Sequence, residues 1–348
     1  MSETWDVVRR AVDADPVGGR FLLTGPASPL NPPTHTGAGR IVSLRMRPMA
    51  LAERGVGVPT VSLAALLDGS RPTLDGETDA GLDEYAYEIV ASGFPGLRGI
   101  ADRAVRAQLD GYIERVIDHD FRDLGGTTVR NQATLQRWLS AYSCAISSTA
   151  SYEKIRDAST AGHTEKPAKD TVLHWLDTLE RLWMIEPLPA WSPQRNDLSR
   201  LIQSPKHHLV DPALAARLRG ATLGALLDAA PAGQLGPRDG TLFGVLFESL
   251  VTQSVRVYAQ AAEARVSHFR TRNGDREADL IVERADRRVV ALEVKAAHAI
   301  GDSDVEHLAW LKDRIGPDLL DALVISTGPY AYRRPDGVGV VPAALLGA

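Results

Sequence analysis

Charged residues inside two apolar segments constrain this chain more than any other feature of its sequence. Residues 274–297, GDREADLIVERADRRVVALEVKAA, have the pattern of two β-strands joined by a short charged turn. The first apolar run contains Asp279, and the second contains Glu293 and Lys295 on either side of a valine. A buried charge without compensation is strongly unfavourable, so these three side chains must compensate one another or bind a counter-ion.

The spacing predicts that the three charged groups meet. Glu293 and Lys295 are two residues apart and therefore point to the same face of a strand. A hairpin would bring Asp279 alongside them on the paired strand. Carboxylate oxygens are the ligands that Mg²⁺ and Mn²⁺ prefer, and a lysine ammonium beside them suits a phosphate group or an attacking water molecule. We therefore expect a divalent cation, Mg²⁺ or Mn²⁺, at this position.

This stretch resembles the PD-(D/E)XK phosphodiesterase superfamily, with Asp279 as its aspartate and Glu293 and Lys295 as its E-x-K. The superfamily often has a further acid on the preceding helix, and Glu248 is the only charge in the apolar run FGVLFESLV. The resemblance implies Glu248, Asp279, Glu293 and Lys295 as catalytic residues, of which the three acids bind the metal. No proline precedes Asp279, which departs from one form of the motif. Two alternatives are an exposed hairpin with a surface Asp–Lys pair and a nuclease fold that has lost its activity.

The rest of the chain predicts a mixed α/β protein in several parts. Residues 1–60 contain two apolar segments with strand character, GRFLLTG and RIVSLRM, and residues 61–130 are mostly helical. Residues 131–215 have three helical segments followed by a hairpin, the pattern of a winged helix. We expect Trp138, Leu139, Tyr142, Leu176 and Leu179 to share one core there. Residues 216–348 alternate between helices and strands, and form the nuclease-like α/β domain.

The order of short segments along the chain is similar to that of a prokaryotic AAA-type ATPase family. RFLLTG, SGFPGL, LHWLDTLERLWMIEPLPAW, SPKHHLVDPALAARLRG and GTLFGVLFESLV carry this likeness. It implies that residues 1–60 are the remnant of an ATPase core, followed by a winged helix and a nuclease-like domain. The chain lacks the sequence G-x-x-x-x-G-K-[ST], so we expect it to bind no ATP. An ATPase module in cis or in trans is an expected partner.

Composition limits the remaining possibilities. The chain has 348 residues, a formal net charge of -5 and a single cysteine, Cys144. One cysteine excludes an internal disulfide, and with no apolar run of membrane-spanning length we expect a cytoplasmic protein without membrane contact. A negative net charge is unusual for a dedicated nucleic-acid binder, so any DNA contact must come from a local patch. Lys166, Lys169, His174 and Arg181 form the candidate patch; winged helices also serve as protein-packing modules, and both interpretations stay open.

Two functions follow from these patterns. The first is a phosphodiesterase that depends on Mg²⁺ or Mn²⁺ and acts on DNA. The second is a non-catalytic regulatory or DNA- or protein-binding scaffold that works with an ATPase and retains an inactive nuclease fold.

Overall fold

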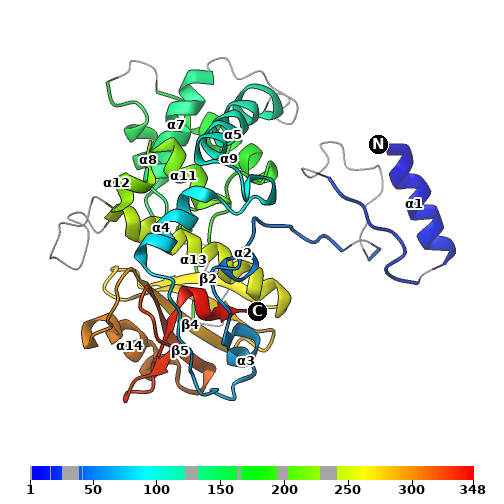
Figure 1. Ribbon diagram of the computed structural model, residues 1–348. Helices are drawn as coiled ribbons and strands as arrows, with labels where there is room; N and C mark the ends of the chain where they lie inside the picture. Colours follow the sequence, from blue (N-terminus) through cyan, green and yellow to red (C-terminus); the bar gives the residue numbers. More distant parts are fainter. Residues whose placement is uncertain are drawn as a thin grey trace.

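The computed structural model describes residues 2–15, 17–25, 39–40, 42–121, 132–162, 166–193, 203–227 and 241–348. The fold is mixed α and β, as predicted, with one six-stranded sheet. Figure 1 shows the sheet in the lower half of the molecule, most of the helices in the upper half, and α13 between them. The predicted boundary between residues 130 and 131 lies outside the described residues.

The helical half is formed by these helices: α4 (Leu82–Ala91), α5 (Asp102–Arg115), α7 (Gln132–Cys144), α8 (Tyr152–Ala158), α9 (Lys169–Arg181), α11 (Pro212–Leu218) and α12 (Leu223–Leu227). A short 3₁₀ turn, η1 (Pro95–Leu97), joins α4 to α5, and a π-helical turn, η2 (Val116–Asp120), extends α5. The five residues expected to share a core, Trp138, Leu139, Tyr142, Leu176 and Leu179, are all buried in one hydrophobic cluster, which confirms that prediction.

Two antiparallel bridges lie between α9 and α11, Ile185 with Leu209 and Leu188 with Lys206. They agree with the hairpin expected after the third helix, although the chain between the two arms lies outside the described residues. The assignment of this unit as a winged helix stays a prediction.

The sheet has the order β2-β3-β4-β5-β7-β6. Its strands are β2 (Arg265–Arg270), β3 (Glu277–Glu283), β4 (Val289–Lys295), β5 (Leu319–Ser326), β6 (Tyr332–Arg333) and β7 (Gly339–Pro342). β3 and β4 are antiparallel, as the sequence predicted, whereas β4, β5 and β7 run parallel. The crossover from β4 to β5 contains η3 (Asp302–Asp304), α14 (Glu306–Ile315) and η4 (Gly316–Asp318), as a parallel connection requires.

Alternation along β4 divides the core into two layers. Val290 and Leu292 belong to the large cluster that α13 (Thr241–Ala261) and the helical half complete. Val289 and Ala291 belong to a smaller cluster with α14 on the other face. Because the large cluster runs without interruption from the sheet into the helical half, the two halves share one hydrophobic core.

The N-terminal part supplies four further elements: α1 (Ser2–Ala14), α2 (Leu51–Arg54), β1 (Val61–Ser62) and α3 (Leu63–Asp68). β1 pairs in parallel with β8 (Leu346–Gly347), which follows η5 (Ala343–Leu345), so β1 lies beside the C-terminus. Figure 1 shows α1 standing away from the body of the molecule.

The two strands predicted within residues 1–60 are absent from the described residues there. Residues 20–25 and 42–46 pair with no strand in the described part of the chain, and Leu22 and Met46 are 87% and 92% exposed. The strand prediction was therefore wrong for both segments. An alternating pattern indicates that a segment suits a sheet, but a strand forms only where a partner supplies the hydrogen bonds.

Candidate functional site

The end of the β3–β4 hairpin gathers the predicted charged residues. The last paired residues of the two strands are Leu280 and Leu292, and Asp279 and Glu293 are the next residue on each strand. Asp279 is 7% exposed and Glu293 is 3% exposed. The hairpin therefore places these two carboxyl groups next to each other at the end of the ladder, as the sequence predicted.

A buried lysine that the sequence analysis missed completes the cluster. The Lys206 ammonium donates to Glu248 Oε1 and to Asp279 Oδ1, both at 2.7 Å, and Lys206 itself is only 6% exposed. The second oxygen of Asp279 accepts a hydrogen bond from the backbone N–H of Val294 at 2.9 Å. Both Asp279 oxygens are thus already engaged, and Glu248 on α13 is joined to β3 through an ammonium group.

Glu293 and Lys295 form the second pair of the site. Their side chains are 2.9 Å apart, which agrees with a shared strand face, and the Lys295 side chain is 34% exposed. The other Glu293 oxygen, Oε2, is buried and has no hydrogen-bond partner. Glu293 therefore has a buried oxygen that no hydrogen bond occupies.

Burial and neighbouring charge separate the protonation states of the three acids. Burial raises the pKa of Glu248 to about 8, with a further contribution from Asp279, and Lys206 offsets only part of the rise. Burial and Asp279 likewise raise the pKa of Glu293 to about 8 against the opposing effect of Lys295. Burial would also raise the pKa of Asp279, but Lys206 and the Val294 N–H outweigh it and lower that pKa. At neutral pH, Asp279 is thus the ionised acid that faces Lys206.

The present arrangement does not fit a divalent metal ion. A metal bound by Glu248, Asp279 and Glu293 would need the position between Glu248 and Asp279 that the Lys206 ammonium takes. Over the described ranges, no three His, Cys, Asp or Glu side chains are grouped so as to hold a metal ion. The chemistry that the four predicted catalytic residues present here is a chain of ion pairs and hydrogen bonds.

Main-chain pairing holds Lys206 in its position. The backbone of Lys206 exchanges two hydrogen bonds with Leu188, at 2.8 and 2.9 Å. Shortly after Leu188, the same segment pairs with β2, where the N–H of Trp191 donates to the carbonyl of His268 at 2.6 Å and the His268 N–H donates to Pro189. Lys206 therefore reaches the end of the hairpin on a segment that is itself attached to the sheet.

Three histidines around this segment are buried and structural. His207, His208 and His268 are each 1% exposed, and burial lowers the pKa of all three. His268 hydrogen bonds the Ser204 carbonyl at 3.1 Å, and Lys206 adds to the depression of its pKa, which falls to about 4.

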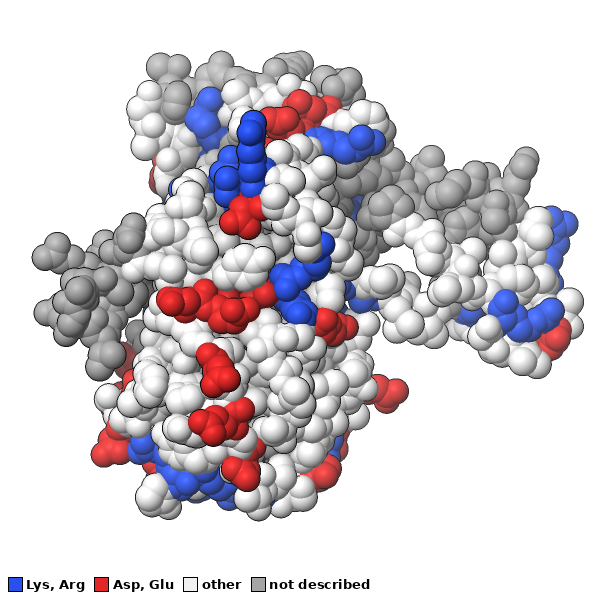
Figure 2. Space-filling view, in the orientation of Figure 1, with Lys and Arg blue, Asp and Glu red and all other residues white. Residues whose placement is uncertain are grey.

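The four predicted nucleic-acid-binding residues lie on or just before α9, and acids accompany three of them. Lys166 pairs with Asp157 and Glu153, Lys169 lies 3.8 Å from Glu153, and Arg181 lies 3.8 Å from Asp177. The fourth, His174, packs edge-on against the ring of Phe121. On the face shown in Figure 2, Lys and Arg side chains lie in small groups next to Asp and Glu. DNA contact by these residues stays a prediction.

The arginines near the N-terminus are structural. Arg45 and Arg47 lie 2.9 and 2.8 Å from Glu186, and the Arg45 guanidinium lies over the Trp183 ring at 4.3 Å. Arg256 on α13 approaches the same carboxylate at 3.5 Å. These contacts fasten the segment before α2 to the body of the protein.

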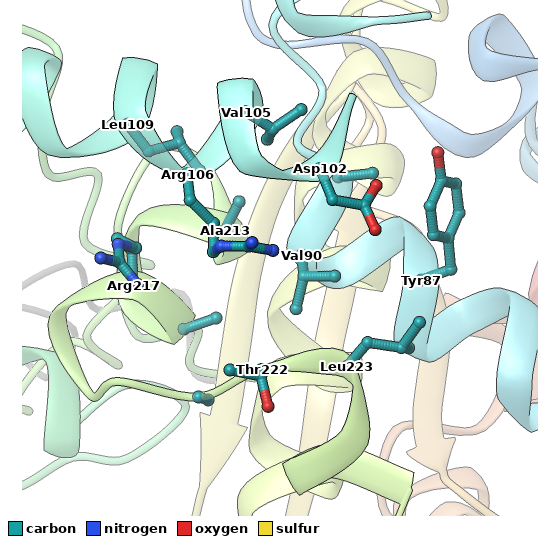
Figure 3. A pocket seen from close by; sticks show the side chains of 13 residues that line it. Tyr87, Val90, Asp102, Val105, Arg106, Leu109, Ala213, Arg217, Thr222 and Leu223 are labelled. Atoms are coloured by element: carbon teal, nitrogen blue, oxygen red, sulfur yellow. The ribbon is translucent and has the colours of Figure 1, made fainter. Parts of the chain in front are cut away.

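A small pocket lies in the helical half, away from the charged cluster (Figure 3). Its volume of about 50 Å³ admits only a few water molecules. Its walls come from α4, α5, α11 and α12 and include Tyr87, Val90, Asp102, Val105, Arg106, Leu109, Ala213, Arg217, Thr222 and Leu223. We assign no ligand to this pocket.

Comparison with known families gives two matched regions, one on either side of residues 225–242. Residues 243–346 match the family model of a domain of unknown function, DUF4143. Residues 82–224 match that of a second domain of unknown function, DUF8612. DUF4143 is often found in proteins associated with AAA ATPases. No curated protein and no solved structure matches the chain. In the part of the chain that the structure describes, no helix has both the length and the apolar character to cross a membrane.

The two matched regions meet at the charged cluster. Glu248, Asp279, Glu293 and Lys295 belong to the DUF4143 region, whereas Lys206 belongs to the DUF8612 region. The ion pairs of Lys206 therefore join one matched region to the other.

Proposed function

We propose that this chain is a non-catalytic binding or regulatory module, built on a nuclease-like α/β core, that works together with an ATPase. One observation carries this proposal: the Lys206 ammonium lies between Glu248 and Asp279, where phosphodiester chemistry would need a metal ion. The match to DUF4143, a domain often found in AAA ATPase-associated proteins, supports the choice of partner. The absence of a phosphate-binding loop sequence supports a role in which another chain or module hydrolyses ATP.

The shared hydrophobic core favours a module that acts as one rigid body. Buried apolar residues connect α13 and the sheet to the helices of the other matched region. A ligand that moves the helical half would therefore move the sheet with it, because no hinge separates the two through the shared core. DNA is the candidate ligand of the helical half, through Lys166, Lys169, His174 and Arg181.

The metal-dependent phosphodiesterase remains the second candidate. It is favoured by the unpaired Oε2 atom of Glu293 and by the partial exposure of Lys295 beside it. The Glu293 Oε2 atom is an acceptor without a hydrogen-bond partner, and the Lys295 ammonium is a partly exposed donor.

One experiment separates the two candidates. The purified chain is incubated with single- and double-stranded DNA in 5 mM Mg²⁺ or Mn²⁺, in parallel with the Lys295→Ala variant. We expect no cleavage by either protein. Cleavage by the wild-type chain that disappears in Lys295→Ala would refute the non-catalytic proposal. DNA binding is measured in the same samples by fluorescence anisotropy, with a Lys166→Glu/Lys169→Glu variant as the control for the candidate patch.

A further inference from the structure

The charged cluster resembles a metal site in which the ammonium group of Lys206 takes the place of the metal ion. Lys206 Nζ lies 2.7 Å from one oxygen of Glu248 and 2.7 Å from one oxygen of Asp279. Glu293 Oε2 lies buried in the same cluster without a partner. Three acids converge, and one ammonium group compensates two of them.

We propose that Lys206 is a built-in replacement for a divalent cation, and that its ammonium group alone keeps Glu248, Asp279 and Glu293 from forming a site for Mg²⁺ or Mn²⁺. This inference rests on the non-catalytic function proposed above and adds the reason for it. The ligand class follows from the donors, which are carboxylate oxygens throughout.

The geometry requires only a small adjustment to accept a metal in place of the ammonium. Mg–O bonds are about 2.1 Å long, so each of the two carboxylate oxygens would move inward by about 0.6 Å from its present distance to Nζ. A third ligand would require the buried Glu293 Oε2 to turn toward this position. The metal would also favour ionised Glu248 and Glu293, whose protons burial now retains.

The ammonium group is a permanent part of the fold and does not serve as a releasable gate. The backbone of Lys206 is paired with Leu188, and the next two residues, His207 and His208, are buried. Withdrawing the ammonium would leave the buried Asp279 carboxylate without its counter-charge, which is strongly unfavourable. The site is therefore constitutively closed to metal in the wild-type chain.

Lys206→Met tests the proposal, because methionine keeps the aliphatic stem but ends one atom short of Nζ. The variant leaves a space of about one ion between Glu248 and Asp279, with both acids in place. Melting temperature and calorimetric titration are measured with Mn²⁺ for the wild type, Lys206→Met and Lys295→Met. The last is the matched control, since it removes a neighbouring ammonium but leaves Lys206 seated.

We expect Lys206→Met to bind one Mn²⁺ per chain, with a rise in melting temperature of roughly 4 °C at saturating metal. The melting temperatures of the wild type and of Lys295→Met should change by less than about 1 °C under the same conditions. In both proteins the Lys206 ammonium still occupies the metal position, so Mn²⁺ does not bind and does not stabilise the fold. Adding Glu248→Gln to Lys206→Met should abolish the rise. A folded Lys206→Met that ignores Mn²⁺, while the wild type also ignores it and cleaves no DNA, would overturn this inference and leave the proposed function standing. A wild type that binds Mn²⁺ and cleaves DNA would overturn both.

A variant that does not fold in buffer still gives a result. Lys206→Met is then refolded with and without Mn²⁺, next to Lys206→Met/Asp279→Asn, in which the ionised acid facing the vacant position is neutral. Folding of Lys206→Met only with Mn²⁺ supports the proposal. The proposal is refuted if Lys206→Met does not fold with or without Mn²⁺ while Lys206→Met/Asp279→Asn does fold. That result would show that Mn²⁺ cannot neutralise Asp279 in place of the Lys206 ammonium.

Discussion

Acid should destabilise this protein through His268, and the size of the effect follows from its surroundings. His268 is 1% exposed and lies near Lys206, and burial followed by that ammonium charge lowers its pKa from 6.5 to about 4. The unfolded chain takes up the proton below pH 6.5, whereas the folded chain does so only near pH 4. Between these values the unfolded state binds more protons, so the free energy of unfolding falls as the pH is lowered.

The two pKa values set the magnitude. At pH 7.5 both states are unprotonated at this ring and His268 has no effect on the pH dependence. At pH 5 the unfolded ring is almost fully protonated and the folded ring is mostly neutral, which lowers the free energy of unfolding by about 2 kcal/mol.

Urea denaturation of the wild type and His268→Gln at pH 7.5 and pH 5 measures this contribution. Glutamine is neutral at both values and its amide can donate to the Ser204 carbonyl that His268 now contacts. The difference in stability between the two proteins should shift by about 2 kcal/mol in favour of the variant at pH 5, because titrations that both proteins share cancel. His298→Gln, at an exposed histidine, is the control substitution. An unchanged difference between the two pH values would show that the folded state protonates His268 as readily as the unfolded state does.

Three further substitutions test the packing of charge. Glu293→Gln should be nearly neutral at pH 4 and stabilising at pH 8 in thermal melts, because the unfolded state loses this proton near 4.5 whereas the folded state holds it up to about pH 8; equal effects at both pH values would contradict the raised pKa. Glu88→Ala should cost about 3–5 kcal/mol in urea denaturation, because its partner Arg54 has a fully buried side chain that would lose its counter-charge, and a loss under 1 kcal/mol would argue against this ion pair. Gly93→Ala should lower the melting temperature, since the added Cβ would lie 2.8 Å from the Met49 carbonyl oxygen; an unchanged melting temperature would mean that the backbone relaxes there.

The sequence was most informative where local pattern and global fold agree. Alternation and apolar content predicted β3 and β4 and their antiparallel pairing, because both strands lie in the middle of the chain's main core and their turn is short. The same pattern predicted that Asp279, Glu293 and Lys295 converge. Residues 42–46 alternate just as well, yet they form no strand, because no strand in the described part of the chain pairs with them and the Val42 and Leu44 side chains are exposed.

Lys206 escaped prediction because its partners are remote in the sequence. Glu248 is 42 residues away and Asp279 is 73 residues away, and no periodic pattern links a loop lysine to either. A signal was nevertheless present. Lys206 precedes the segment HHLV, whose residues are all buried, just as Glu248 is the only charge in the apolar run FGVLFESLV. A single cation in one apolar segment and a single anion in another are candidates for an ion pair. The criterion that selected Glu248, a lone charge in an apolar run, would also have selected Lys206.

The pairing between residues 189–191 and β2 determines where this chain can be cut to produce the sheet as a fragment. β2 is the outermost strand of the sheet on its side, and the segment that covers it comes from beyond the DUF4143 match, as does the counter-charge of Asp279. A fragment cut to the limits of that match would carry a bare strand edge, and exposed edges recruit other chains and promote aggregation. The region that matches the family model is thus smaller than the unit in which the edge of β2 is covered, and an expression boundary for the sheet should lie before Leu188.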